Sequence, residues 1–158
     1  MTGITKDVLD APFCFRETPA SLPADLRPLW RVSAFVLILS FSRANRASIR
    51  KLQITNWAIR TENGMRTLSS FLKGQVSSEE VLIRFDPAFL IALDLGIHEG
   101  LFENKGGNIL ELTKAGIQFA QLISSESDCF VKEKEFLKAI KPYFLEKHIA
   151  ELLKTAFK

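Results

Sequence analysis

The stretch IHEGLFENKGGNILELTKAG, residues 97–116, constrains the fold of this chain more than any other. Apolar residues close a helix, and two short strand-like runs, LFEN and ILEL, lie on either side of the sequence KGGN. Gly106 and Gly107 supply the positive φ angles that a tight hairpin turn requires. Thr113 can cap a helix that follows the second run. The stretch therefore predicts a helix, a β-hairpin and a second helix in direct succession.

Most of the remaining chain has the apolar spacing of helices. The predicted helices cover residues 28–42, 47–61, 65–72, 87–99 and 113–124, and residues 129–157 form either two helices or one helix kinked at Pro142. The helix over residues 28–42 is apolar nearly all round, so we expect it to be buried. Ser48 or Asn45 can cap the next helix, and Asn63-Gly64 is expected to interrupt the chain after it. Residues 81–85, VLIRF, are strand-like or extended, and Asp86-Pro87 starts the helix that follows, with Asp86 as its cap and Pro87 at its first position.

A group of helices followed by a hairpin is the pattern of a winged-helix domain. The predicted fold is mainly α with a small β-hairpin: a winged-helix domain with an N-terminal arm and C-terminal helices. A chain of 158 residues has room for one domain with extensions. We assign residues 1–26, with three of the six prolines, to an irregular arm, residues 27–124 to the winged-helix domain, and residues 125–158 to a helical extension.

The composition is that of a soluble globular protein, with 47% hydrophobic and 25% charged residues. The longest apolar run, residues 34–39, is far shorter than the roughly 20 residues of a bilayer crossing, and the N-terminus does not resemble a secretion signal, so we expect a cytoplasmic protein. Cys14 and Cys129 are expected to be buried thiols without a disulfide. Thirteen Phe against one Tyr favour cores and dry protein interfaces over surfaces that stack nucleobases.

The positive charge is concentrated in one region. Residues 27–73 hold nine Lys or Arg and one acid, which gives +8, whereas residues 1–26 give −2 and residues 74–158 give −3. Four of these cations cluster between the first two predicted helices: Arg43, Arg46, Arg50 and Lys51. They are the candidates for contact with a nucleic-acid backbone. A solvated face without a partner is the simpler interpretation of this cluster, and an acidic protein partner is a further alternative.

The helix before the hairpin, residues 87–99, argues against the usual winged-helix contact with DNA. As a DNA reader this helix would enter the major groove, where bases are recognised mainly by Arg, Lys, Asn and Gln, and it contains none of the four. Its charges are Asp94 and Glu99, which phosphates would repel. A protein-docking role for its apolar residues is the competing interpretation, and burial of all of them in the core is the structural alternative.

The sequence gives no sign of catalysis. His98 and His148 lie on different predicted helices, and neither has other ligands at metal-binding spacing. The chain lacks the glycine-rich nucleotide-binding motifs and the nucleophile motif GxSxG. We therefore expect a non-enzyme without a cofactor or a metal.

Five stretches carry a resemblance to a known family. In chain order they are LWRVSAFVLILSF, SRANRASIRKL, LQITNWAIRT, RFDPAFLIALDLGIHEGLFE and GGNILELTKAG, which together span roughly residues 28–124. They resemble the small middle component of bacterial ABC-three-component systems, a group that includes the Lamassu-type antiphage operons. The most specific of them is RFDPAFLIALDLGIHEGL.

The resemblance implies a non-catalytic bridging subunit in an SMC-like ATPase complex for antiphage or anti-plasmid defence. Such a subunit docks the ATPase and an effector nuclease, in a hetero-oligomer that can touch DNA without sequence preference. The resemblance carries an interface role to Phe85, Asp86, Phe89 and Lys105 at the hairpin tip. The alternative, a winged-helix transcriptional regulator that binds DNA, is suggested by the hairpin and the basic segment.

Overall fold

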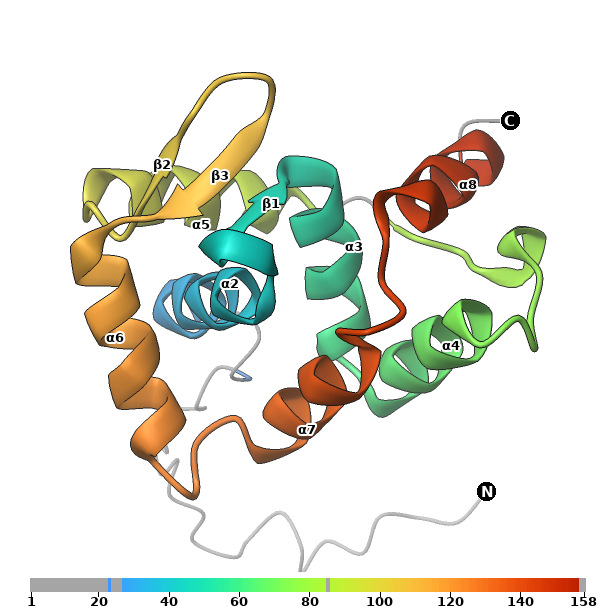
Figure 1. Ribbon diagram of the computed structural model, residues 1–158, viewed down its shortest axis with the longest axis horizontal. Helices are drawn as coiled ribbons and strands as arrows, with labels where there is room; N and C mark the ends of the chain where they lie inside the picture. Colours follow the sequence, from blue (N-terminus) through green and yellow to red (C-terminus); the bar gives the residue numbers. More distant parts are fainter. Residues whose placement is uncertain (1–22, 24–26, 85, 157–158) are drawn as a thin grey trace, which may run out of the picture.

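The computed structural model describes residues 23, 27–84 and 86–156 of the chain. Seven α-helices and a small antiparallel sheet make up this part (Figure 1). The helices are α2 (Pro28–Phe41), α3 (Ile49–Ile59), α4 (Glu62–Leu72), α5 (Pro87–His98), α6 (Lys114–Ser125), α7 (Val131–Ile140) and α8 (Glu146–Ala156), with short 3-10 helices η2 (Arg43–Asn45) and η3 (Ser78–Glu80). The expectation of a mainly α fold with a small β element is confirmed. The predicted N-terminal arm, apart from residue 23, lies outside the described residues.

The predicted hairpin is present as strands β2 (Phe102–Asn104) and β3 (Ile109–Leu112), joined by a turn in which Gly106 and Gly107 have φ angles of 91° and 60°. A third strand, β1 (Arg46–Ser48), pairs with the free side of β3, so the strand order is β1-β3-β2. The prediction placed Arg46 in a polar interruption and began the next helix at Ala47, which is wrong, because α3 begins at Ile49. The pairing of β1 is set by a segment some 60 residues away, which places buried Ala47 opposite Leu110.

Three helix starts follow from the local sequence as predicted. The side chains of Ser48, Asp86 and Thr113 accept hydrogen bonds from the backbone N–H groups of Lys51, Ala88 and Gly116, each at 3.1 Å. These side chains satisfy N–H groups that have no acceptor inside the helix. They therefore fix where α3, α5 and α6 begin.

The interruption expected at Asn63-Gly64 is misplaced. Thr61 caps α4 by accepting from the N–H of Gly64 at 2.9 Å, so Asn63 and Gly64 lie in the first turn of that helix. Gly64 is used there because a Cβ atom would lie 2.6 Å from the carbonyl oxygen of Ala58 in the preceding helix. The break between the two helices falls at Arg60 and Thr61 instead.

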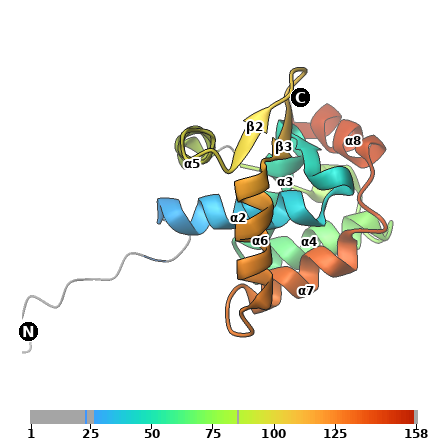
Figure 2. The same cartoon turned by 60° about the vertical axis from the view of Figure 1, so that its left-hand side comes forward.

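Helix α2 is the centre of the molecule, as its apolar sequence predicts. Helices α3, α5, α6 and α7 all pack against it; Figure 1 shows it in the middle of these helices, and Figure 2 shows its N-terminal turns extending past α6. From Val32 to Leu39 every side chain except that of Ser33 is buried. Burial of a large apolar side chain contributes about 1.5–3 kcal/mol, so this helix organises the fold.

The C-terminal segment forms two helices, α7 and α8, with Pro142 between them, which agrees with the first of the two predicted alternatives. Their apolar residues join the same core as α2, among them Phe136, Leu137 and Ile140. Residues 81–84 are unpaired rather than part of a strand. The two C-terminal helices thus complete the surroundings of the site described next.

Candidate functional site

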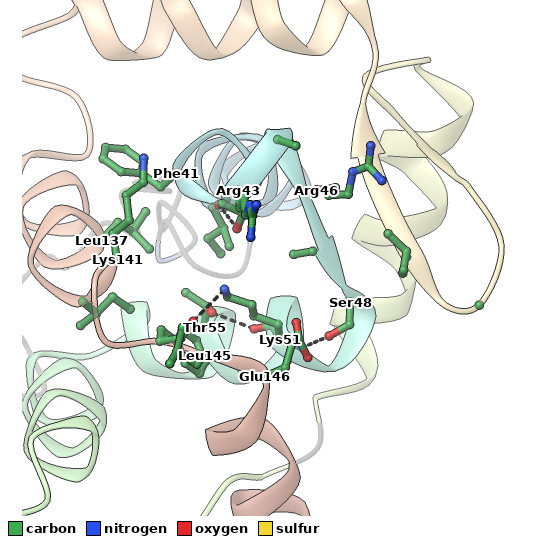
Figure 3. A pocket seen from close by; sticks show the side chains of 18 residues that line it. Phe41, Arg43, Arg46, Ser48, Lys51, Thr55, Leu137, Lys141, Leu145 and Glu146 are labelled. Atoms are coloured by element: carbon green, nitrogen blue, oxygen red, sulfur yellow. Dashed lines mark hydrogen bonds between the residues drawn. The ribbon is translucent and has the colours of Figure 1, made fainter.

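A cavity of about 770 Å³ lies where the C-terminal end of α2, η2, β1, the start of α3 and the α7–α8 connection meet (Figure 3). Its apolar lining includes Ile38, Phe41, Leu137, Ile140 and Phe144. Its charged lining consists of four cations and one acid: Arg43, Arg46, Lys51, Lys141 and Glu146. A volume of this size is within the range of small-molecule sites in proteins.

Lys51 is the cation held most firmly in this cavity. Its Nζ donates a hydrogen bond to the carbonyl oxygen of Phe144 at 3.0 Å and lies 5.0 Å from the centre of the Phe144 ring. Burial lowers the pKa of Lys51 below its ordinary value of 10.5, and the nearby carboxylate of Glu146 partly opposes that shift. Glu146 therefore offsets only part of the cost of burying this ammonium.

The structure brings together three of the four predicted backbone-binding residues. Arg43, Arg46 and Lys51 line the cavity, whereas Arg50 is exposed on α3 outside it. Nη2 of Arg46 lies 3.5 Å from Oε2 of Glu111 on the neighbouring strand, and Figure 3 shows this side chain turned towards the hairpin. Three of the four residues thus belong to a concave surface, and the four do not form one continuous basic face.

Two lining residues, Lys141 and Glu146, were not identified from the sequence. They lie about 90 residues after the basic junction and reach it because α7 and α8 pack near α2 and α3. Neither residue belongs to a motif, and each is one of many charges in a helical region of alternating sign. No local signal could have identified them.

The four predicted docking residues differ in position and in burial. Phe85 lies outside the described residues. Phe89 is 2% exposed and packs against Phe35 with 5.0 Å between ring centroids, so it is a core residue and cannot present its ring to a partner. Lys105 is exposed in the hairpin, where its Nζ lies 2.6 Å from Oε1 of Glu103.

Asp86, the fourth predicted docking residue, makes contacts inside the protein, with the start of α5 and with two arginines. Besides capping α5, its Oδ2 lies 2.5 Å from Nη1 of Arg31 and accepts a hydrogen bond from Nη1 of Arg60 at 2.9 Å. The Arg31 contact is a close ion pair without hydrogen-bond geometry, and among the described residues no acceptor bonds its guanidinium nitrogens. The carboxylate of Asp86 therefore compensates the positive charge of Arg31, whose side chain is only 2% exposed.

Helix α5 keeps a second set of apolar residues on the surface. Leu90, Ile91 and Ile97 are 53%, 64% and 38% exposed, and Asp94 is exposed on the same helix. The alternative that every apolar residue of this helix belongs to the core is right for Phe89 and wrong for these three. No Lys or Arg lies within α5. The helix thus presents an apolar, cation-free surface, which we call the α5 face.

The described residues hold no group of three His, Cys, Asp or Glu side chains that could bind a metal ion. Nor does any helix in this part of the chain combine the length and the apolarity needed to cross a bilayer. Cys129 is a free, half-buried thiol, and Cys14 lies outside the described residues. Comparison of the chain with models of protein families, with curated proteins and with solved structures finds no match.

Proposed function

We propose that this chain is a winged-helix, non-catalytic bridging subunit of an SMC-like ATPase complex in antiphage or anti-plasmid defence, where it docks the ATPase and an effector nuclease. The observation that carries the proposal is the α5 face, with Leu90, Ile91 and Ile97 exposed and no cation on the helix. The family and the two partners come from the sequence resemblance, and the docking surface comes from the geometry.

The order of the elements supports a winged helix. Strand β1 lies between α2 and α3 in the chain, and helix α5 directly precedes the hairpin β2-β3. Strand β1 pairs with β3, so the three strands form one small sheet. In this arrangement α5 occupies the place of the recognition helix and the hairpin that of the wing. Helix α4 and η3 are then an insertion before α5.

The chemistry of α5 favours a polypeptide partner over a duplex. A helix that binds DNA gains free energy by releasing counterions through Lys and Arg, and α5 has neither. The apolar side chains of Leu90 and Ile91 can form neither hydrogen bonds nor ion pairs with phosphates, whereas their burial against a protein partner contributes up to about 1.5–3 kcal/mol each. Asp94 on the same helix would repel a duplex but can lie at the polar rim of a protein interface.

Co-expression with the neighbouring genes tests the proposal. The tagged chain should co-purify with a coiled-coil ATPase, and Leu90→Asp together with Ile91→Asp should abolish that association while the circular dichroism spectrum stays unchanged. Leu122→Asp is the matched control, because Leu122 on α6 is 64% exposed and leaves the α5 face intact.

Two results would overturn the proposal. One is a chain that purifies alone in the presence of its neighbours. The other is nanomolar, sequence-specific binding of a palindromic DNA site by the isolated protein, which would indicate a transcriptional regulator. Binding to DNA that is sensitive to salt and blind to sequence would agree with the bridging role.

A further inference from the structure

The cavity at the basic junction has a chemistry that the docking role does not use. One side is apolar, with Phe41, Leu137 and Phe144, and the cations that line it outnumber its acids by four to one. Of these cations Arg43, Arg46 and Lys141 are exposed and Lys51 is half-buried, so the cost of burying a charge, which a bound anion would offset, applies chiefly to Lys51. An apolar wall beside them adds affinity only for a ligand that also has an apolar part.

We propose that this cavity binds a small organic anion, whose acidic group contacts Lys51 and Arg43 and whose apolar or aromatic body packs along Phe41, Leu137 and Phe144. The inference does not depend on the bridging role, since no residue of the α5 face lines the cavity.

The position of the Lys51 ammonium supports an anion at this place. An ammonium has three N–H donors, and among the described residues its Nζ has one acceptor, the carbonyl oxygen of Phe144. Figure 3 shows Lys51 and Arg43 pointing into the cavity from α3 and from η2. The remaining donors of Lys51 therefore face space that an acidic group can enter.

The start of α3 adds to the positive potential. Ser48 and Lys51, in the cap and the first turn of this 11-residue helix, both line the cavity. The N-terminus of a helix carries a partial positive charge, which favours an anion nearby. Within the part of the chain that the structure describes, Glu146 is the one acid in the lining, and it reduces this potential without cancelling the charges of Arg43, Lys51 and Lys141.

The shape of the site favours a small molecule over a DNA backbone. A cavity of about 770 Å³ can enclose a ligand, whereas phosphates on a duplex are met by cations on an open surface. Phe41 and Phe144 line the cavity but would make no favourable contact with phosphates. Arg50, another of the predicted backbone contacts, is exposed outside the cavity.

Two fluorescent probes with the same ring system test the proposal on the full-length protein. One is 8-anilinonaphthalene-1-sulfonate, an aromatic anion, and the other is N-phenyl-1-naphthylamine, which lacks the sulfonate. We expect saturable binding of one sulfonate probe per chain, at least about tenfold tighter than that of the neutral probe, which corresponds to about 1.4 kcal/mol. Equal affinities for the two probes would overturn the proposal.

Charge-removing variants locate the binding. Arg43→Gln with Lys141→Gln should weaken sulfonate binding by about tenfold or more and leave the neutral probe unaffected. The matched control, Arg66→Gln with Lys138→Gln, removes one Arg and one Lys that are exposed outside the cavity, and it should change nothing. Equal losses in both double variants would show that net charge, not the cavity, holds the probe.

Two further measurements separate this site from its neighbours. Leu90→Asp with Ile91→Asp should leave sulfonate binding unchanged, and a loss there would move the site to the α5 face. A bound anion should also raise the pKa of the Lys51 amine, measured by NMR in the wild-type protein, in which Glu146, Arg43 and Lys141 are the neighbouring charges of the cavity. An unchanged pKa would contradict contact between the anion and Lys51. Displacement of the probe by a short DNA duplex, weakened in the Arg43/Lys141 variant, would assign the cations to phosphate backbone and overturn the proposal.

Discussion

Asp86 is the residue whose replacement should reveal most about how this fold is held together. It caps α5 and faces both Arg31 and Arg60, so Asp86→Ala removes a helix cap and leaves the charge of Arg31 without compensation. Removing one partner of a buried ion pair costs about 3–5 kcal/mol. Loss of a cap typically costs about 1 kcal/mol. Because Arg31 is 2% exposed and Arg60 is 28% exposed, we assign most of the loss to Arg31.

Urea unfolding followed by circular dichroism measures this loss. A domain of this kind is stable by about 5–15 kcal/mol, so Asp86→Ala should remove a large fraction of its free energy of unfolding. Asp86→Asn keeps a side chain that can cap α5 and removes only the charge, so most of the loss should persist. Asp86→Ala with Arg31→Met should recover a large part of it, since the stranded charge is gone.

The reasoning fails if Asp86→Asn is as stable as the wild type, because the carboxylate would then act only as a cap. It also fails if Arg31→Met does not rescue Asp86→Ala. Glu62→Gln is the matched control for ion pairing, since Glu62 pairs with Lys132 at an exposed site and its loss should be close to undetectable.

Three further outcomes can be measured on the same protein. Gly96→Ala should destabilise the fold by about 1–3 kcal/mol in urea unfolding, because its Cβ would lie 2.1 Å from Cζ of the Phe102 ring; a stability gain would contradict this packing. Lys51→Met should remove a pH dependence. Burial lowers the folded pKa of Lys51, so the unfolded chain binds more protons and wild-type stability should rise relative to the variant as pH increases from that lowered pKa towards 10.5. Arg46→Glu with Arg50→Glu, both exposed, should weaken any DNA association of the complex in electrophoretic mobility shifts without unfolding the chain, and unchanged binding would exclude these two cations as contacts.

The sequence predicts what is decided locally. Ser48, Asp86 and Thr113 were identified as caps because each acts within three residues of its own position. Strand β1 was missed because three residues carry no periodicity, and Ala47 becomes part of a strand only through Leu110. A strand that forms only by pairing with a distant segment therefore cannot be located from the local sequence.

The candidate sites divide in the same way. Arg43, Arg46 and Lys51 were expected to lie together because they are close in sequence, and they do. The role of Phe89 was misjudged because its neighbour Leu90 is equally apolar, and only the packing of α5 on α2 decides which of the two is buried. Both residues fit the same sequence pattern, so the pattern could not separate a core residue from a surface one.

The basic segment of residues 27–73 is less basic in the fold than in the sequence. Arg31 and Arg60 lie against Asp86, Arg46 lies near Glu111, and Lys51 is influenced by Glu146. All three acids come from the acidic half of the chain, so folding returns negative charge to the region that carries +8.

This redistribution bears on both proposals. The salt dependence of DNA binding scales with the number of phosphates neutralised, at about 0.9 per phosphate, so cations already paired within the protein should contribute little to it. The isolated chain should therefore bind DNA weakly and without sequence preference, with a smaller salt dependence than nine unpaired cations would give, which suits a subunit that meets its partner through α5. A single acidic group entering the cavity acts at short range, where Lys51 and Arg43 face it directly, and does not need a strongly basic surface.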